Sequence, residues 1–275
     1  MPGTLEKHLS SAPSMFDAYG RQARLYPALL VILPIFLLVV ACFPGLVTST
    51  SAATLLTVAS SCGLLYAAAS LARTQGKKVE KRILLERGGW PTTMLLRHSG
   101  RLDTFSRARY HAYLSKSIPD LDFPTREEEA AHPADADEVY ASAIKWLKEQ
   151  TRGRDFPLVE KENAQYGFRR NMRGLKKIAI AILLLVIALC LSIMAYRIYS
   201  GEYTTLNIDL PIILTAVYGI ITTLFWSILV NDEWVWEAGE QYAEALLATC
   251  DQLNSGNSSP QKKKASPRVR SVGHE

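Results

Sequence analysis

The sequence predicts a mainly α-helical, polytopic membrane protein with four transmembrane helices in two pairs and a helical cytoplasmic domain inserted between the pairs. Two observations carry this prediction: four long apolar runs, and an uneven distribution of Lys and Arg around them. The composition of the 275 residues as a whole, 48% hydrophobic, would also suit a soluble protein. The fold class therefore depends on where the apolar residues lie.

The four apolar runs are 20, 21, 19 and 23 residues long and lie at residues 28–47, 52–72, 178–196 and 208–230. Their only charged residue is Asp209, near the start of the fourth run. About 20 apolar residues are needed to cross a hydrocarbon core of roughly 30 Å. Buried helices of a soluble protein would need far more amphipathic chain around them. The first run reaches spanning length after a lead-in of roughly 25 residues, which argues against a cleaved signal peptide.

The basic residues predict sidedness. Residues 73–177 contain 22 Lys and Arg against 15 Asp and Glu, the link 48–51 contains none, and only Arg197 lies between the third and fourth runs. Cytoplasmic loops of membrane proteins carry the excess of positive charge. We therefore expect a multi-pass protein with both termini and the long insert in the cytoplasm.

Six segments follow along the chain. They are a cytoplasmic or interfacial lead-in (1–25), the first pair of spans (26–73), a basic cytoplasmic domain (74–177), the second pair (178–230), a C-terminal cytoplasmic helix (231–254) and a Ser/Pro/Lys-rich disordered tail (255–275).

Within the basic domain we expect a helix that continues the second span as far as Gly88-Gly89, a basic helix over Leu95–Tyr113 and an amphipathic helix over Asp135–Thr151. Thr125 and Glu128 have the spacing of a capping box, which predicts a short helix start between the last two.

No pattern in the sequence indicates catalysis. The five histidines are scattered, no glycine-rich phosphate loop is present, and the four cysteines have no metal-site spacing. We expect no enzyme activity, no catalytic or metal site and no cofactor.

Basic side chains are the candidate ligand-binding residues. One group, interleaved with aromatic residues, lies within the insert: Arg97, Arg101, Arg107 and Arg109. Guanidinium groups and aromatic faces are what a nucleotide or short single strand requires, although plain surface charge explains them equally well. A second group, Arg169 and Arg170, adjoins the third span, where attraction to anionic membrane lipid is the stronger alternative.

The fourth span is the candidate pore helix. Thr215, Gly219, Thr222 and Trp226 share one helical face, and Asp232 and Glu233 would form an acidic inner mouth. The alternative is hydrogen bonding between helices. Since one chain has too few helices to enclose a water path, conduction needs a homo-oligomer, with a tetramer as the working hypothesis.

Two features could hold an oligomer together. One is a stripe on the C-terminal helix formed by Val235, Ala238, Tyr242 and Ala245, which could equally pack against the membrane domain. The other is a small-residue ladder on the second span formed by Ala59, Gly63 and Ala67, for which plain helix packing and a pore-lining face are the alternatives.

The order of segments, with Tyr166-Gly167-Phe168-Arg169-Arg170-Asn171 just before the third span, resembles the SMODS-associated four-transmembrane effectors of bacterial anti-phage systems. It also resembles, more loosely, the channel component of Hailong defence. The resemblance implies a pore-forming effector in the bacterial inner membrane, controlled by a nucleotide signal from a partner nucleotidyltransferase. A non-conducting membrane sensor or scaffold is the rival hypothesis. A small-solute transporter is a third, disfavoured because no inverted repeat or intramembrane charge pair is evident.

Overall fold

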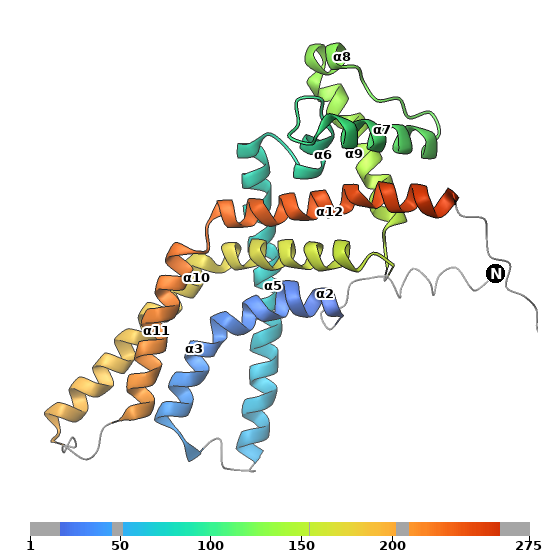
Figure 1. Cartoon of the computed structure of the whole chain (residues 1–275). Helices are drawn as coiled ribbons and strands as arrows, with labels where there is room; N and C mark the ends of the chain where they lie inside the picture. Colours follow the sequence, from blue (N-terminus) through green and yellow to red (C-terminus); the bar gives the residue numbers. More distant parts are fainter. Residues whose placement is uncertain (1–16, 46–51, 154, 202–208, 259–275) are drawn as a thin grey trace, which may run out of the picture.

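The computed structural model describes residues 17–45, 52–153, 155–201 and 209–258, with the side chains of all of these except 52–62 and 256–258. This part of the chain is helical, with connecting turns and no strand, as the sequence predicts (Figure 1). Residues 1–16 of the lead-in and residues 259–275 of the expected tail lie outside the described residues.

Among the described residues, three helices are long and apolar enough to cross a membrane. The first is the continuous helix Ala18–Cys42, in which α2 (Ala18–Gly20) and α3 (Tyr26–Cys42) flank a π-helical turn, η1 (Arg21–Leu25). The others are α10 (Pro157–Tyr199) and α11 (Leu210–Ile228). The second expected span lies in α5 (Ala52–Arg87), whose side chains are described only from residue 63. The count of four spans therefore stays a prediction.

The apolar parts of these helices form a bundle. Figure 1 shows α3, α5, α11 and the second half of α10 descending side by side. Leu183 and Trp226 are fully buried in its core. The outer faces expose apolar side chains, among them Leu185, Ile221 and Ile228. Soluble proteins rarely expose large contiguous apolar patches, so these faces suit contact with lipid.

Helices α5 and α10 cross at two glycines. A Cβ at Gly174 would collide with the backbone of Gly76, so only a glycine permits this approach. One turn away, fully buried Asn171 donates its Nδ2 to the carbonyl oxygen of Ala23 at 2.6 Å. Pro27, four residues after Ala23, has no N–H to donate to that carbonyl. Asn171 therefore supplies the donor that Pro27 lacks and fixes the first helix against α10.

The insert contains four helices: α6 (Pro91–Leu96), α7 (Thr104–Ser117), α8 (Arg126–Ala131) and α9 (Pro133–Gln150). They share an apolar core with α12 (Asp232–Ser258), built around Tyr140, Leu147 and Leu246. In Figure 1, α12 lies between the insert and the first half of α10. Helix α12 continues to Ser258, beyond the expected end at residue 254.

Two expectations for the insert have different outcomes. The basic helix expected over Leu95–Tyr113 is wrong as one element, because the chain turns between α6 and α7. A Cβ at Gly100 would meet three backbone carbonyl oxygens, so glycine is needed in that turn. The capping box is confirmed: the backbone N–H groups of Thr125 and Glu128 each donate to the other's side chain, at 2.7 and 3.2 Å.

The stripe on α12 packs within the chain. Val235, Ala238 and Ala245 are buried, and Tyr242 packs on the core of the insert. The stripe is therefore covered by this chain's own helices and is not free to join a second copy. The ladder on α5 behaves differently, since Gly63 and Ala67 are exposed; Ala59 lies where side chains are not described.

Candidate functional site

A cavity of about 1150 Å³ lies where seven elements of the described chain meet, outside all four apolar runs. It is bounded by α2, η1, α5, the start of α6, the end of α9, the start of α10 and α12. Seven basic side chains line it: Arg24, Arg73, Lys77, Lys148, Arg152, Lys161 and Arg170. Only three acidic ones do so, Asp17, Glu80 and Glu160, together with four aromatic rings, those of Tyr19, Trp90, Tyr166 and Tyr242. The cavity is therefore both electropositive and rich in aromatic surface.

Lys148 is the unusual cation of this cavity. Its Nζ lies 5.5 Å from the ring centre of Trp90 and 5.8 Å from that of Tyr242, within the range of cation–π attraction. Burial lowers the pKa of Lys148, although the negative charge of Glu80 opposes this. Among the described residues, no carboxylate pairs with this ammonium group and no acceptor hydrogen-bonds to it. Its position between two rings leaves a partly desolvated positive charge without a counter-ion.

One carboxylate of the cavity, that of Glu80, is already engaged. Glu80 Oε1 accepts from Arg170 Nη1 at 2.7 Å, and both side chains are 9% exposed. The Nζ of Lys77 lies 3.9 Å from the other carboxylate oxygen of Glu80. Arg73 and Lys161 have no ion-pair partner in the described part of the chain. Positive charge therefore exceeds what the cavity's own carboxylates neutralise.

The guanidinium groups that the sequence singled out in the insert have partners within the chain. Arg97 forms a two-point ion pair with Asp137, with Nε donating to Oδ1 at 2.7 Å. This side-chain hydrogen bond is the main reason that the pKa of Arg97 is raised. Arg107 is buried and donates to the carbonyl oxygens of Arg97, His98 and Leu102 at 2.6 to 3.1 Å. It closes the turn between α6 and α7.

The other two members of that group fasten the insert to α12. Arg101 pairs with Glu240 at 3.0 Å and with Glu244 at 2.7 Å. Arg109 pairs with Asp251 at 3.2 Å. None of these four predicted residues lines the cavity; of the predicted ligand-binding residues, only Arg170 does. Whether the four bind a ligand stays a prediction.

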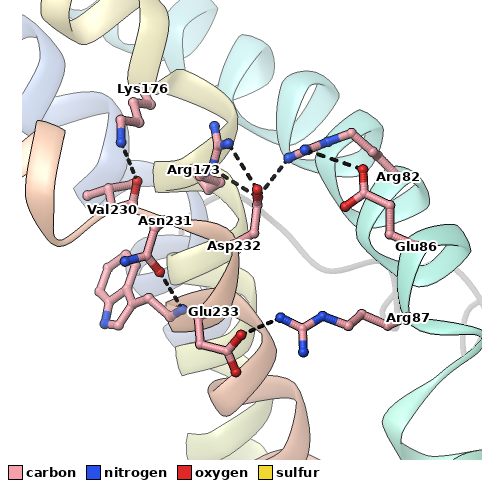
Figure 2. A network of polar contacts seen from close by, with 10 residues as sticks. Arg82, Glu86, Arg87, Arg173, Lys176, Val230, Asn231, Asp232 and Glu233 are labelled. Carbon is pink, nitrogen blue, oxygen red and sulfur yellow. Dashed lines mark hydrogen bonds and ion pairs between the residues drawn. The ribbon is translucent and has the colours of Figure 1, made fainter.

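A second polar cluster holds the junction between α11 and α12 (Figure 2). Arg169, Arg173 and Lys176 lie on one face of α10, which is turned toward this junction. Arg169 donates to the carbonyl oxygen of Trp234 at 3.0 Å, and Lys176 donates to that of Val230 at 2.9 Å. These side chains thus satisfy backbone carbonyls at the helix break.

The acidic residues predicted at a pore mouth belong to the same cluster. Asp232 pairs with Arg82 at 2.7 Å and with Arg173 at 3.0 Å, and Glu233 pairs with Arg87 (Figure 2). The two arginines lower the pKa of Asp232 against the opposing effect of burial. In a single chain these carboxylates therefore join α12 to α5 and α10.

The hydroxyl face of α11 packs inside the chain. Thr215 is buried and its Oγ1 donates to the carbonyl oxygen of Pro211 at 2.8 Å. Gly219 lies against Ile187 of α10, and Trp226 is fully buried. Thr222 is half-buried. These contacts satisfy one alternative, packing between helices, without deciding whether the face also borders a pore.

The cavity was missed because its residues are far apart in the sequence. One signal was available: Lys148 follows Tyr140 and Ile144 at four-residue steps along the buried face of α9. A lysine that continues an apolar stripe is uncommon and indicates a cation that the fold buries in part. Arg73, within α5, and Trp90, just after that helix, gave no comparable signal in the sequence.

Comparison with known proteins gives no relative: no family model, curated protein or solved structure matches this chain. The features on which a function can be based are therefore the chain's own. In the described part of the chain they are apolar helices of membrane-spanning length and an electropositive, aromatic-lined cavity beside them.

Proposed function

We propose that this chain is an ion-conducting membrane effector that works as a homo-oligomer, such as a tetramer, in the bacterial inner membrane. Both termini and the insert are cytoplasmic, and a nucleotide or oligonucleotide bound there controls conduction. On the resemblance to SMODS-associated effectors, the signal comes from a partner nucleotidyltransferase and the role is anti-phage defence.

One observation supports this proposal above the others. Helices α5 and α10 each run without a break from the wall of the basic cavity into the apolar bundle. The Glu80–Arg170 ion pair joins the two helices at that wall. A ligand that changes how α5 and α10 pack in the cavity therefore also acts on their packing in the bundle, because each helix is continuous between the two places.

The junction cluster provides a second link. Since α10 holds the break between α11 and α12 through Arg169, Arg173 and Lys176, a shift of α10 reaches the candidate pore helix directly. A ligand moves such an equilibrium only by binding one arrangement more tightly than the other.

The rival function is a non-conducting membrane sensor that recruits a partner protein. One observation favours it: Thr215, Gly219 and Trp226 of the candidate pore face pack inside a single chain. Conduction then depends on Thr222 and on how copies assemble.

Current across planar bilayers containing the purified protein tests the proposal. We expect a current that a nucleotide or oligonucleotide changes, and a different unitary conductance for Thr222→Leu. Ile221→Leu, on the exposed side of the same helix, is the matched control and should conduct as the unaltered protein does. If the assembled protein binds ligand but carries no current under any condition, the channel function is wrong and the non-conducting sensor is the remaining function.

A further inference from the structure

We propose that the cavity is a binding site for a phosphate-bearing ligand with planar rings, in which Lys148 is the central cation. This inference rests on the proposed function for the identity of the signal as a nucleotide, but the site itself is argued from the cavity alone. None of Arg97, Arg101, Arg107 and Arg109 takes part in it.

The first argument is charge. A partly desolvated ammonium without a counter-ion is unfavourable, and proteins generally pair such groups. The carboxylate of Glu80 cannot serve, because Arg170 and Lys77 already share it. Arg73, which also lines the cavity, adds a second cation without an ion-pair partner among the described residues. An incoming anion would supply the missing counter-charge.

The second argument is the aromatic surface. Trp90 lies just after the end of α5 and lines the cavity, and 43% of its surface is exposed. Its indole and the Tyr242 ring flank Lys148. Stacking on such rings favours a nucleobase and is tolerant of sequence. A bare phosphate would not use these surfaces.

The third argument is size. Pockets for small molecules are typically about 300–1,000 Å³. The volume here, about 1150 Å³, exceeds that range. It suits a ligand with more than one phosphate and more than one ring better than it suits a mononucleotide. Several cations spread around the wall, rather than one cluster, agree with a ligand of that extent.

A lipid headgroup could bring the same phosphate chemistry. Arg73 directly follows the second apolar run and Arg24 precedes the first, so one end of the cavity lies level with the ends of these runs. The two sources share the cation site and differ in whether the phosphate arrives from solution or from the bilayer.

Direct binding measurements on the full chain in nanodiscs separate these sources. The soluble probes are ATP and a linear adenosine trinucleotide, with discs made of neutral phosphatidylcholine. The lipid arm uses discs that also contain phosphatidylglycerol and follows the emission of Trp90, isolated by comparison with Trp90→Leu. We expect a soluble probe to bind in neutral discs, and the trinucleotide to bind more tightly than ATP.

The test of the site is Lys148→Gln, which should weaken binding about tenfold, as expected for one lost charge-assisted contact. Arg73→Gln should weaken it similarly and reduce its salt dependence. The matched control is Lys145→Gln, an exposed lysine on the same helix that does not line the cavity. Lys148→Arg keeps the positive charge and should retain most of the binding, which would show that Lys148→Gln acts through the lost charge and not through misfolding.

Each outcome decides the matter. Binding of only the anionic lipid, with the same dependence on Lys148, would retain the phosphate site and assign the lipid as its ligand. Equal affinities for Lys148→Gln and Lys145→Gln, or no binding by any probe, would overturn the site. Binding without current would remove the channel function but keep the cavity. A ligand-dependent current that is unchanged by Lys148→Gln would keep the channel function but remove the cavity as the ligand site.

Discussion

This molecule has two basic regions, one formed by neighbouring residues of the insert and one assembled only by folding, and they differ in what their cations contact. The first, in the insert, contains Arg97, Arg101, Arg107 and Arg109, and every guanidinium group there meets a carboxylate or a backbone carbonyl of the same chain. The second, the cavity, contains Lys148 and Arg73, which have no ion-pair partner among the described residues. Positive charge in a sequence is therefore not the same as positive charge available to a ligand.

The difference lies in what each fold brings to the cation. Helix α12 presents Glu240, Glu244 and Asp251 to the insert, so its arginines fasten helices together. The cavity meets α12 instead at Gly239 and Tyr242, which carry no charge. The same helix thus neutralises one basic region and leaves the other electropositive.

The largest expected effect comes from the buried ion pair at the cavity, between Glu80 and Arg170. Glu80→Ala would leave Arg170 buried without its carboxylate, which should destabilise the protein by about 3–5 kcal/mol. Thermal unfolding of the purified protein measures this as a melting temperature lower by roughly 10 °C. The control is the double variant Glu80→Met with Arg170→Met, which should recover most of the loss, since an apolar pair of similar volume is often neutral. A double variant as unstable as the single one would show that the pair is not what holds α5 to α10.

How well the fold can be predicted depends on whether a feature is set by neighbouring residues or by residues far apart in the sequence. Local signals were sufficient for the helical class, the helix breaks at Gly88-Gly89 and the Thr125–Glu128 capping box, because these depend on neighbouring residues. The turn at Gly100 was not foreseen, since it is stabilised by Arg107 from the following helix. Non-local partners decide such features.

The candidate site depended even more on tertiary structure. Lys148, Trp90 and Tyr242 belong to three separate segments, and only folding places the two rings beside the ammonium group. Asp232 and Glu233 show the same limit: their charge suggested a pore mouth, and their partners on α5 and α10 became visible only in space (Figure 2).

A smaller effect is expected on the pH dependence of ligand binding in the cavity. Burial lowers the pKa of Lys148, and a bound phosphate would raise it again by pairing with the ammonium. Between those two values binding takes up a proton, so affinity should fall as pH rises, by up to about tenfold per pH unit. Of the titratable groups around the cavity, Glu80 acts on the charge of Lys148 and the Tyr242 ring lies beside its ammonium group. Burial raises the pKa of Tyr242 to about 12, so that phenol stays neutral over the range used.

Titration calorimetry of the trinucleotide at several pH values, in buffers of different ionisation enthalpy, measures this proton uptake. Lys148→Arg is the control, because a guanidinium group stays protonated throughout. Its affinity should be nearly constant over the same range. Equal pH dependence in both proteins would assign the proton to another group and separate Lys148 from the ligand.

The smallest effect is expected where the sequence alone would place the largest. Replacing Arg101 and Arg109 together with Gln removes exposed ion pairs to α12, which should contribute little to stability because solvent screens them. Neither residue lines the cavity, so trinucleotide affinity and its salt dependence should remain those of the unaltered chain. Thermal unfolding and direct binding on one preparation measure both quantities. A large loss of affinity with little change in melting temperature would reverse the comparison: the exposed arginines would then exchange their carboxylates for phosphates, and the insert would be the sensor.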